Sequence, residues 1–238
     1  MILSKPFNRK WFFTTFLVLA GTALCTRLGI WQLDRLEQRR AFNTQVQTMQ
    51  ASSMLNLNDS TPEDIATMEW RAVTVTGEYD LENQLAIRNQ YNGDQYGYHL
   101  ITPLLYNGIA VLVDRGWIPA DSDWHTFDET GEVTVTGQIR LGSAKPAIGG
   151  VADALPVDGK KLEVWNNFDV EKMSAQYSYP ISKIYIQPNV DSSDTIPPIP
   201  YQPTLELTEG PHFGYAIQWF SFAGLLFFGY PFYLRKQE

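Results

Sequence analysis

Two apolar segments near the ends of the chain constrain its fold more than any other feature. Residues 11–26 carry no formal charge, and the apolar character continues past Arg27 to residue 31. Residues 213–234 form a second uncharged stretch of 22 residues, closed by Arg235 and Lys236. About 20 apolar residues suffice for a helix to cross a bilayer, and an arginine near the end of such a helix extends its charge toward the headgroups. We therefore expect two membrane-spanning helices.

Other interpretations of each segment are weaker. A cleaved signal peptide ends in small residues, whereas this segment ends at Leu24, Cys25 and Arg27. A lipid-modified Cys25 is disfavoured by the bulky Leu24 before it. The alternative for residues 213–234 is a buried core helix, which an acidic domain of this size could hardly enclose. The sequence favours an uncleaved anchor at each end.

Basic residues flank the two segments on the same side. Three precede the first (Lys5, Arg9 and Lys10), and Arg235 with Lys236 follow the second. The positive-inside rule places such flanks in the cytoplasm, and a long intervening domain is translocated. We expect a cytoplasmic N-terminus over residues 1–10, spans over 11–31 and 212–234, a periplasmic domain over 32–211 and a cytoplasmic tail over 235–238. No Arg- and Ser-rich presequence precedes the first span, so the expected location is a bacterial inner membrane.

Composition excludes several classes of function. Residues 32–211 carry 13 more acidic than basic side chains, which argues against a nucleic-acid surface. Cys25 is the sole cysteine, so an intramolecular disulfide and a cysteine-based zinc site are both excluded. The sequence also lacks a Gly-rich phosphate loop, a G-x-S-x-G elbow and a histidine pair at metal spacing. His125 lies in an acidic turn that could hold a cation, although a solvated loop is the better interpretation. We expect a protein that is not an enzyme.

Apolar periodicity changes from helical to alternating along the middle of the chain. Residues 33–50 predict a solvated helix, residues 51–66 a loop and residues 169–177 a short helix with Asp169 as its N-cap. Asn107-Gly108 predicts a tight hairpin turn, and the Pro-rich residues 196–203 an extended strap. Alternation predicts strands at 70–78, 84–88, 98–105, 109–116, 133–141, 162–165 and 181–187. The expected fold class is a membrane protein with two transmembrane α-helices flanking an external β-rich α+β domain.

Clusters of aromatic residues, glycine and arginine stand at the ends of the expected elements. In order they are residues 28–36 (LGIWQLDRL), 77–80 (GEYD), 97–104 (GYHLITPL), 111–119 (VLVDRGWIP) and 212–220 (HFGYAIQWF). With the two apolar segments, this order resembles the Surfeit-locus family of cytochrome c oxidase assembly proteins. The resemblance implies a role in maturing aa3-type haem–copper oxidase. In bacterial members it implies binding of haem a as a transient cofactor and its delivery to subunit I.

The resemblance also implies site residues. His212 matches the histidine that the family uses as the proposed axial ligand of haem iron, and imidazole is a standard ligand of this kind. At helical spacing Tyr215 and Trp219 share its face, together with two small residues, Ala216 and Ala223. The alternative is an interfacial His-Tyr-Trp cluster that anchors the helix at the headgroups.

Two further groups are possible supporting residues. Trp31, Gln32 and Arg35 could face the histidine from the first span, or could anchor that span at the interface. Arg115, Gly116 and Trp117 could form a rim that holds a haem propionate or touches the oxidase. The interpretation that we favour for the second group is structural: a strand end at which Gly116 permits a turn and Trp117 packs.

The expected partners are haem a, oxidase subunit I and the lipid bilayer, with a haem a synthase as a further candidate and no nucleic acid. One rival function is a periplasmic ligand-binding or sensor module, anchored at both ends and without haem. A second rival is a membrane enzyme such as a hydrolase, for which the sequence shows no nucleophile–base pair.

Overall fold

The computed structural model describes residues 9–143, 151–155, 160–191, 193 and 195–236. It divides into two compact units. One consists of Met1–Gln45 with Glu206–Glu238, and the other of Val46–Leu205. Most of the cytoplasmic N-terminus expected at 1–10, including Lys5, and residues 237–238 of the expected tail lie outside the described residues.

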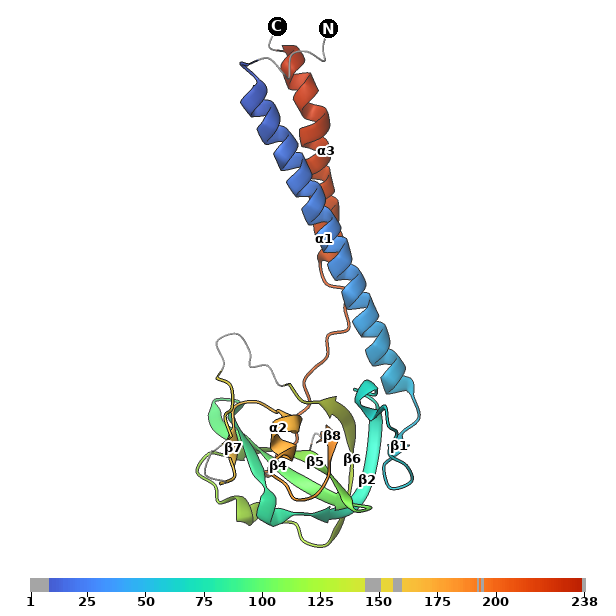
Figure 1. Cartoon of the computed structure of the whole chain (residues 1–238), viewed down its shortest axis with the longest axis vertical. Helices are drawn as coiled ribbons and strands as arrows, with labels where there is room; N and C mark the ends of the chain where they lie inside the picture. Colours follow the sequence, from blue (N-terminus) through green and yellow to red (C-terminus); the bar gives the residue numbers. More distant parts are fainter. Residues whose placement is uncertain (1–8, 144–150, 156–159, 192, 194, 237–238) are drawn as a thin grey trace. The chain divides into compact units, whose positions relative to one another are not determined.

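The first unit contains two long helices that lie side by side, α1 (Phe12–Ala51) and α3 (His212–Lys236) (Figure 1). The apolar segment and the solvated helix expected after it form one continuous helix, because neither proline nor a capping motif separates them. The helices run antiparallel: Thr15 Oγ1 lies 2.6 Å from Tyr230 Oη, and a Cβ on Gly29 would lie 2.7 Å from the Phe220 ring. Small residues at such points let two helices approach closely.

Only α1 is long and apolar enough to cross a membrane among the helices of the described residues. The sequence also predicted a span over residues 212–234, and the structure does not confirm that second span. Helix α3 has sufficient length, at 25 residues, but it contains three tyrosines, three glycines and one tryptophan, which contribute little to hydropathy. One apolar helix and a β-rich domain are therefore shown.

The second unit is built on an eight-stranded sheet in the order β1-β2-β6-β8-β5-β4-β3-β7. An additional β2–β4 pairing closes the strands between them into a barrel. The strands are β1 (Leu55–Asn56), β2 (Ala72–Tyr79), β3 (Leu85–Asn92), β4 (Gln95–Tyr106), β5 (Ile109–Pro119), β6 (Glu132–Leu141), β7 (Val164–Trp165) and β8 (Ile181–Pro188). Short helical turns are η1 (Ile65–Thr67), η2 (Leu81–Asn83), η3 (Trp124–Phe127) and α2 (Val170–Ser174).

All seven predicted strands are confirmed within a few residues. The predicted hairpin is β4–β5, with positive φ at Asn107 and Gly108 (46° and 79°) as its tight turn requires. The prediction of a loop over 51–66 is wrong at Leu55–Asn56, since this two-residue strand pairs parallel with β2. Two residues are too few for alternation to show.

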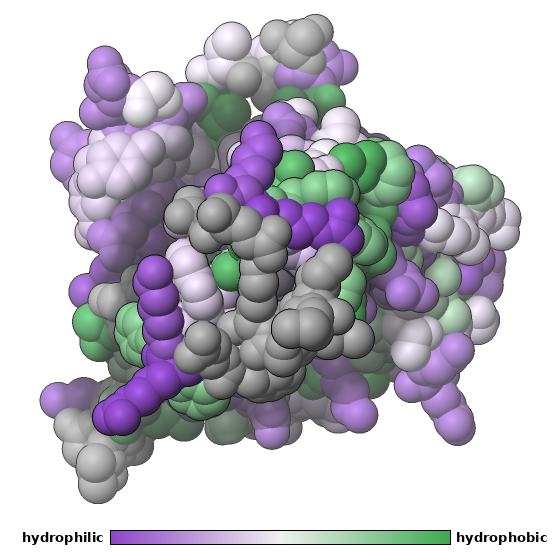
Figure 2. Space-filling model, turned by 90° about the horizontal axis from the view of Figure 1, so that it is seen from above, coloured by the Kyte–Doolittle hydropathy of each residue, from purple (hydrophilic) through white to green (hydrophobic). Residues whose placement is uncertain are grey.

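The short helix and the strap are also confirmed. Asp169 is the N-cap of α2, and its side chain accepts from the backbone N–H of Lys172. The strap reaches β5 through a bridge between Ile199 and Trp117. Two buried apolar clusters fill the domain: one inside the barrel, around Val75, Val113 and Ile186, and one beneath α2, around Trp165 and Met173. On the face seen from above, hydrophilic and hydrophobic residues are interspersed (Figure 2).

Candidate functional site

His212, the first residue of α3, contacts α1 through a side-chain hydrogen bond. Its Nδ1 lies 2.9 Å from Oε1 of Gln32. An amide oxygen only accepts, so Nδ1 carries the ring proton and donates it to Gln32. A neutral imidazole with its proton on Nδ1 keeps its lone pair on Nε2. Gln32, which is 9% exposed, therefore fixes both the orientation and the tautomer of the histidine.

Gly210 lies beside the Nε2 edge of the His212 ring. This glycine has φ +69°, and a Cβ built on it would lie 3.6 Å from Nε2 and 3.4 Å from Cδ2 of His212. Among the described residues Nε2 has no hydrogen-bond partner. A Cβ at this distance would be in ordinary contact with the ring, so the positive φ, more than the space, favours glycine at 210. The sequence prediction missed Gly210, although a glycine two residues before the candidate ligand was a signal.

The other residues predicted to line the haem face of α3 fall into two groups. Tyr215 is 48% exposed and Trp219 is partly buried, with its ring edge-on to Phe222 at 6.0 Å. Ala216 and Ala223 are 1% and 6% exposed. The two alanines therefore belong to the packed side of α3, and the aromatic pair lies at its more open edge.

From α1, the structure places two of the three predicted supporting residues near His212. Gln32 holds the histidine, and Arg35 lines a cavity of about 290 Å³ with His212, Gln38, Arg39 and Phe42. Trp31 is 41% exposed and lies 5.6 Å beneath the guanidinium of Arg35. Arg39 was not singled out from the sequence, because arginine on a charged helix carries no distinguishing pattern.

Arg115, Gly116 and Trp117 lie in the second unit, within β5. The expectation of a turn at a strand end is wrong: β5 continues to Pro119, and Gly116 (φ +116°) stands at a bulge where the pairing with β4 shifts register. A β-bulge adds one residue to one strand, and glycine suits this one because it tolerates a positive φ. Trp117 is 4% exposed and packs, as the structural interpretation predicted.

Arg115 is buried and held by its neighbours. Its Nη2 donates to the carbonyl oxygen of Phe127 at 2.6 Å, and its guanidinium lies 4.9 Å from the ring centre of Tyr79. Burial raises the pKa of Tyr79 to about 12, and the charge of Arg115 opposes that rise. Because the guanidinium already bonds within the domain, its observed contacts are those of a structural residue.

The two remaining histidines differ in environment. His99 is 8% exposed, and its Nδ1 lies 3.0 Å from Oδ2 of Asp114. The side chain of His125 is 70% exposed, and its Nδ1 lies 3.2 Å from Asp128. In the described part of the chain, no group of three metal-binding side chains surrounds either histidine.

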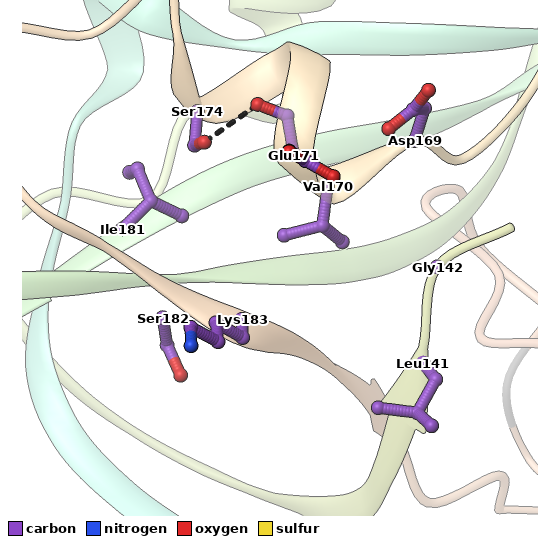
Figure 3. Close-up of a pocket in the computed structure, with 9 residues that line it drawn as sticks. All are labelled: Leu141, Gly142, Asp169, Val170, Glu171, Ser174, Ile181, Ser182 and Lys183. Carbon is purple, nitrogen blue, oxygen red and sulfur yellow. Dashed lines mark hydrogen bonds between the residues drawn. The ribbon is translucent and has the colours of Figure 1, made fainter. Parts of the chain in front are cut away.

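The β domain has a cleft of about 590 Å³ beside α2 (Figure 3). It opens where β6 leaves β8: Leu141 is the last residue paired with β8, and Ser143 N then donates to Phe168 O. Apolar side chains of Leu141, Val170 and Ile181 line it, together with charged Lys183 and Glu171. Both charge signs occur, so the lining does not indicate one class of ligand.

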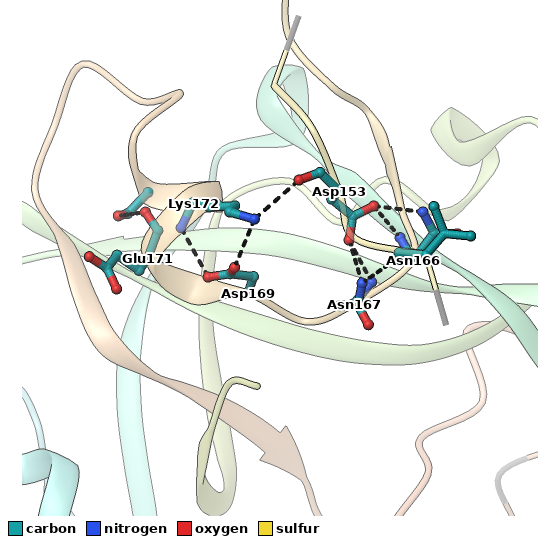
Figure 4. Close-up of polar contacts among 8 residues, drawn as sticks. Asp153, Asn166, Asn167, Asp169, Glu171 and Lys172 are labelled. Carbon is teal, nitrogen blue, oxygen red and sulfur yellow. Dashed lines mark hydrogen bonds and ion pairs between the residues drawn. The ribbon is translucent and has the colours of Figure 1, made fainter. Parts of the chain in front are cut away.

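A polar network stabilises the segment that leads into α2 (Figure 4). The carboxylate of Asp153 accepts from the backbone and side-chain N–H groups of Asn166 and Asn167, at 2.8 to 2.9 Å. These hydrogen bonds lower the pKa of Asp153, although its partial burial acts in the opposite direction. Lys172 joins the network through the carbonyl oxygen of Asp153 and the carboxylate of Asp169. The network is structural, since its donors and acceptors satisfy one another.

These features define a class: a protein with a helix able to span a membrane, a second helix packed antiparallel to it, and a β-barrel domain. The model of the SURF1 family matches residues 19–224, and the chain belongs to that family. A SURF1-like protein of Rickettsia conorii is 25% identical over 94% of this chain and 92% of its own length. An uncharacterised SURF1-like protein of Mycobacterium tuberculosis is 28% identical, over 92% of this chain and 83% of its own length. A Caenorhabditis briggsae SURF1-like protein is 23% identical, over 89% of this chain and 72% of its own.

Proposed function

We propose that this protein is a non-enzymatic assembly factor for aa3-type cytochrome c oxidase, which binds haem a and assists its insertion into subunit I. The observation that carries the proposal is the bond between His212 and Gln32, which leaves Nε2 of an oriented imidazole open beside Gly210. Membership of the SURF1 family supports the assembly role. Haem a would supply the prosthetic group of the oxidase, and this chain would bind, orient and release it.

Each residue has a defined part in this proposal. His212 would supply a nitrogen ligand to the haem iron, and Gln32 would hold the ring so that Nε2 is available for it. Tyr215 and Trp219 offer flat apolar surfaces at the open edge of α3. In the same proposal α3 is a second span, both termini are cytoplasmic, the protein lies in a bacterial inner membrane, and the β domain is periplasmic. A haem a synthase is a further proposed partner.

The test is a reduced-minus-oxidised spectrum of protein purified from cells that make haem a. His212→Ala should abolish the haem signal at matched protein, because the iron loses its nitrogen ligand. His99→Ala and His125→Ala are the matched controls and should retain it. Oxidase activity in the His212 variant should fall without vanishing. An unchanged haem signal in His212→Ala would contradict the proposed ligand.

Gln32→Leu tests the hydrogen bond that orients His212 while it leaves the histidine itself in place. It keeps the volume of the side chain and removes the acceptor of the Nδ1 proton. Loss of an outer-shell partner of this kind typically lowers affinity for the metal by about 10- to 100-fold. Haem affinity should therefore fall in Gln32→Leu without disappearing. Equal affinity in both proteins would show that the hydrogen bond does not serve the ligand.

A second candidate function is a membrane-anchored ligand-binding module without haem, and the cleft of about 590 Å³ beside α2 favours it (Figure 3). Its volume lies in the range of small-molecule sites. This alternative expects wild-type protein to show no haem spectrum. It also expects Val170→Trp, which would fill the cleft, to abolish binding of a soluble ligand and spare oxidase assembly.

A further inference from the structure

The cavity beside His212 combines the candidate iron ligand with two arginines. Arg35, Gln38, Arg39 and Phe42 lie on one face of α1, at spacings of three, four and seven residues, and with His212 they line this cavity of about 290 Å³, which is open to the surface. Gln32 is one turn before Arg35 on the same helix. The residue that orients the imidazole and the two guanidinium groups therefore share one stripe of α1.

The charge of this cavity is positive. Both charged residues that line it are arginines, and no acidic side chain is among the described residues of the lining. In the segment that precedes α3, the carboxylate of Glu209 is engaged by Arg40 through two hydrogen bonds of 2.7 and 2.9 Å. Two cations in one cavity without a counter-charge predict an anionic ligand.

The arginines are positioned and still have hydrogen-bond donors to offer. Arg39 Nε donates to the carbonyl oxygen of Thr208 at 3.0 Å, and Nη2 donates to that of Glu206. Arg35 Nη1 donates to Oε1 of Gln38 at 2.9 Å. A guanidinium has five N–H groups, so both side chains retain donors after these bonds. Their anchors hold them at the cavity, as a binding site requires.

The direction of the helices fits an amphipathic ligand. Along α1 the arginines follow Gln32, away from the apolar residues 12–31. Along α3 Tyr215 and Trp219 follow His212, toward the apolar end of the helix. A porphyrin has two carboxylates on one edge and an apolar rim on the opposite edge. With its iron at Nε2, its carboxylate edge would face the arginines and its apolar rim the aromatic pair.

We propose that Arg35 and Arg39 bind the two carboxylates of the porphyrin whose iron His212 holds. This inference rests on the function proposed above. It adds a second contact that sets which edge of the ligand faces the membrane. A lipid phosphate is the other source of an oxyanion at this position, and the experiment separates the two.

The test uses full-length protein in nanodiscs of zwitterionic lipid, titrated with haemin and with haemin dimethyl ester, whose carboxylates are blocked. Wild-type protein should bind the ester at least about tenfold more weakly than haemin, since charge-assisted bonds to both carboxylates are lost. The Arg35→Gln, Arg39→Gln variant should lose the same factor for haemin and nothing further for the ester. Arg40→Gln is the matched control, because this neighbour pairs with Glu209 and does not line the cavity.

Several outcomes would overturn the proposal. Equal affinity of wild-type protein for haemin and ester would do so, as would Arg variants that weaken both ligands equally. Arg35→Gln alone guards against misfolding, since within the described part of the chain Arg35 hydrogen-bonds to Gln38 of its own helix, whereas Arg39 also holds residues 206 and 208. If anionic lipid displaces haemin from wild type while the ester binds as well as haemin, the cavity is a lipid site. Failure of the proposed function is distinguishable, because then His212→Ala would leave haemin affinity unchanged.

Discussion

Asp114 meets His99 inside the β domain, with Oδ2 of the carboxylate 3.0 Å from Nδ1 of the imidazole and only 4% of the aspartate exposed. The second carboxylate oxygen, Oδ1, is buried without a hydrogen-bond partner among the described residues. The aspartate therefore depends on this one histidine. A buried polar group that loses its partner costs the full penalty of its desolvation.

His99→Ala should accordingly destabilise the β domain, by about 1 to 3 kcal/mol. The control is His125→Ala, which removes an exposed histidine bonded to Asp128 and should change the free energy of unfolding by less than about 0.5 kcal/mol. Chemical denaturation followed by tryptophan fluorescence measures both. Equal stability of the two variants would show that the buried pair contributes nothing. Because neither residue lies in the helix pair, each folded variant should keep its haem spectrum.

Gly116→Ala should destabilise the same domain for two separable reasons. The backbone has φ +116°, which a residue with a side chain rarely adopts, and the new Cβ would lie 2.1 Å from the carbonyl oxygen of Ile199. Gly131→Ala shares the first effect, with φ +91°, but has nothing within 4 Å. We expect Gly131→Ala to lower the free energy of unfolding by about 1 to 3 kcal/mol. Gly116→Ala should lower it by about 1 to 3 kcal/mol more. Equal melting temperatures for the two variants would show that the strap does not press on Gly116.

Two buried tyrosines predict a loss of stability at high pH. Burial raises the pKa values of Tyr79 and Tyr185 to about 12, and the charge of Asp114 adds to the rise for Tyr185. An unfolded tyrosine ionises near pH 10, so between about pH 10 and 12 the unfolded state binds fewer protons than the folded state. Stability is therefore fully present below pH 10 and falls as pH rises through this window, by up to about 1.4 kcal/mol per pH unit for each group.

The measurement is denaturant unfolding at a series of pH values from 8 to 12. Tyr79→Phe and Tyr185→Phe should each flatten the decline above pH 10, because each removes one group that ionises only on unfolding. Tyr91→Phe, at a site 67% exposed, is the control. A decline as steep in the double variant as in wild type would assign the alkaline sensitivity to other groups.

Sequence periodicity predicted the β domain well because its strands are long and alternate clearly. Residues 73–77 and 133–137 share the sequence Val-Thr-Val-Thr-Gly and pair in antiparallel register, with the Thr76 and Thr134 hydroxyl oxygens 2.8 Å apart. Closure of the barrel was not predictable, since it depends on two β2–β4 pairs, at Glu78 and Tyr79. The bulge at Gly116 was missed for a similar reason. Without knowledge of the partner strand, a glycine in this position indicates the end of a strand.

For the candidate site, the sequence identified residues but not their register. Gln32 and His212 were both predicted, but they are 180 positions apart in the sequence. Their contact requires the antiparallel alignment of two helices. Arg39 resembles Arg40 in the sequence, yet one lines the cavity and the other pairs with Glu209 on the surface. The hydrogen bonds and charge of Arg40 lower the pKa of Glu209. Such differences depend on how helix α1 is rotated against its neighbours, which the sequence pattern does not indicate.

The last prediction concerns topology. Contacts along the helix pair bring Trp11 to Tyr233 and Thr15 to Tyr230, so the start of α1 and the end of α3 lie at the same end of that pair. Arg9, Lys10, Arg235 and Lys236 are all at this end, and basic residues stay in the cytoplasm. A C-terminal green fluorescent protein fusion should therefore fluoresce, whereas a C-terminal alkaline phosphatase fusion should be inactive. In a Cys25→Ala background, Asp59→Cys should react with an impermeant maleimide once the outer membrane is opened, because Asp59 is exposed in the β domain. An active phosphatase fusion would place the C-terminus outside, and would contradict a pair of helices that both cross the membrane.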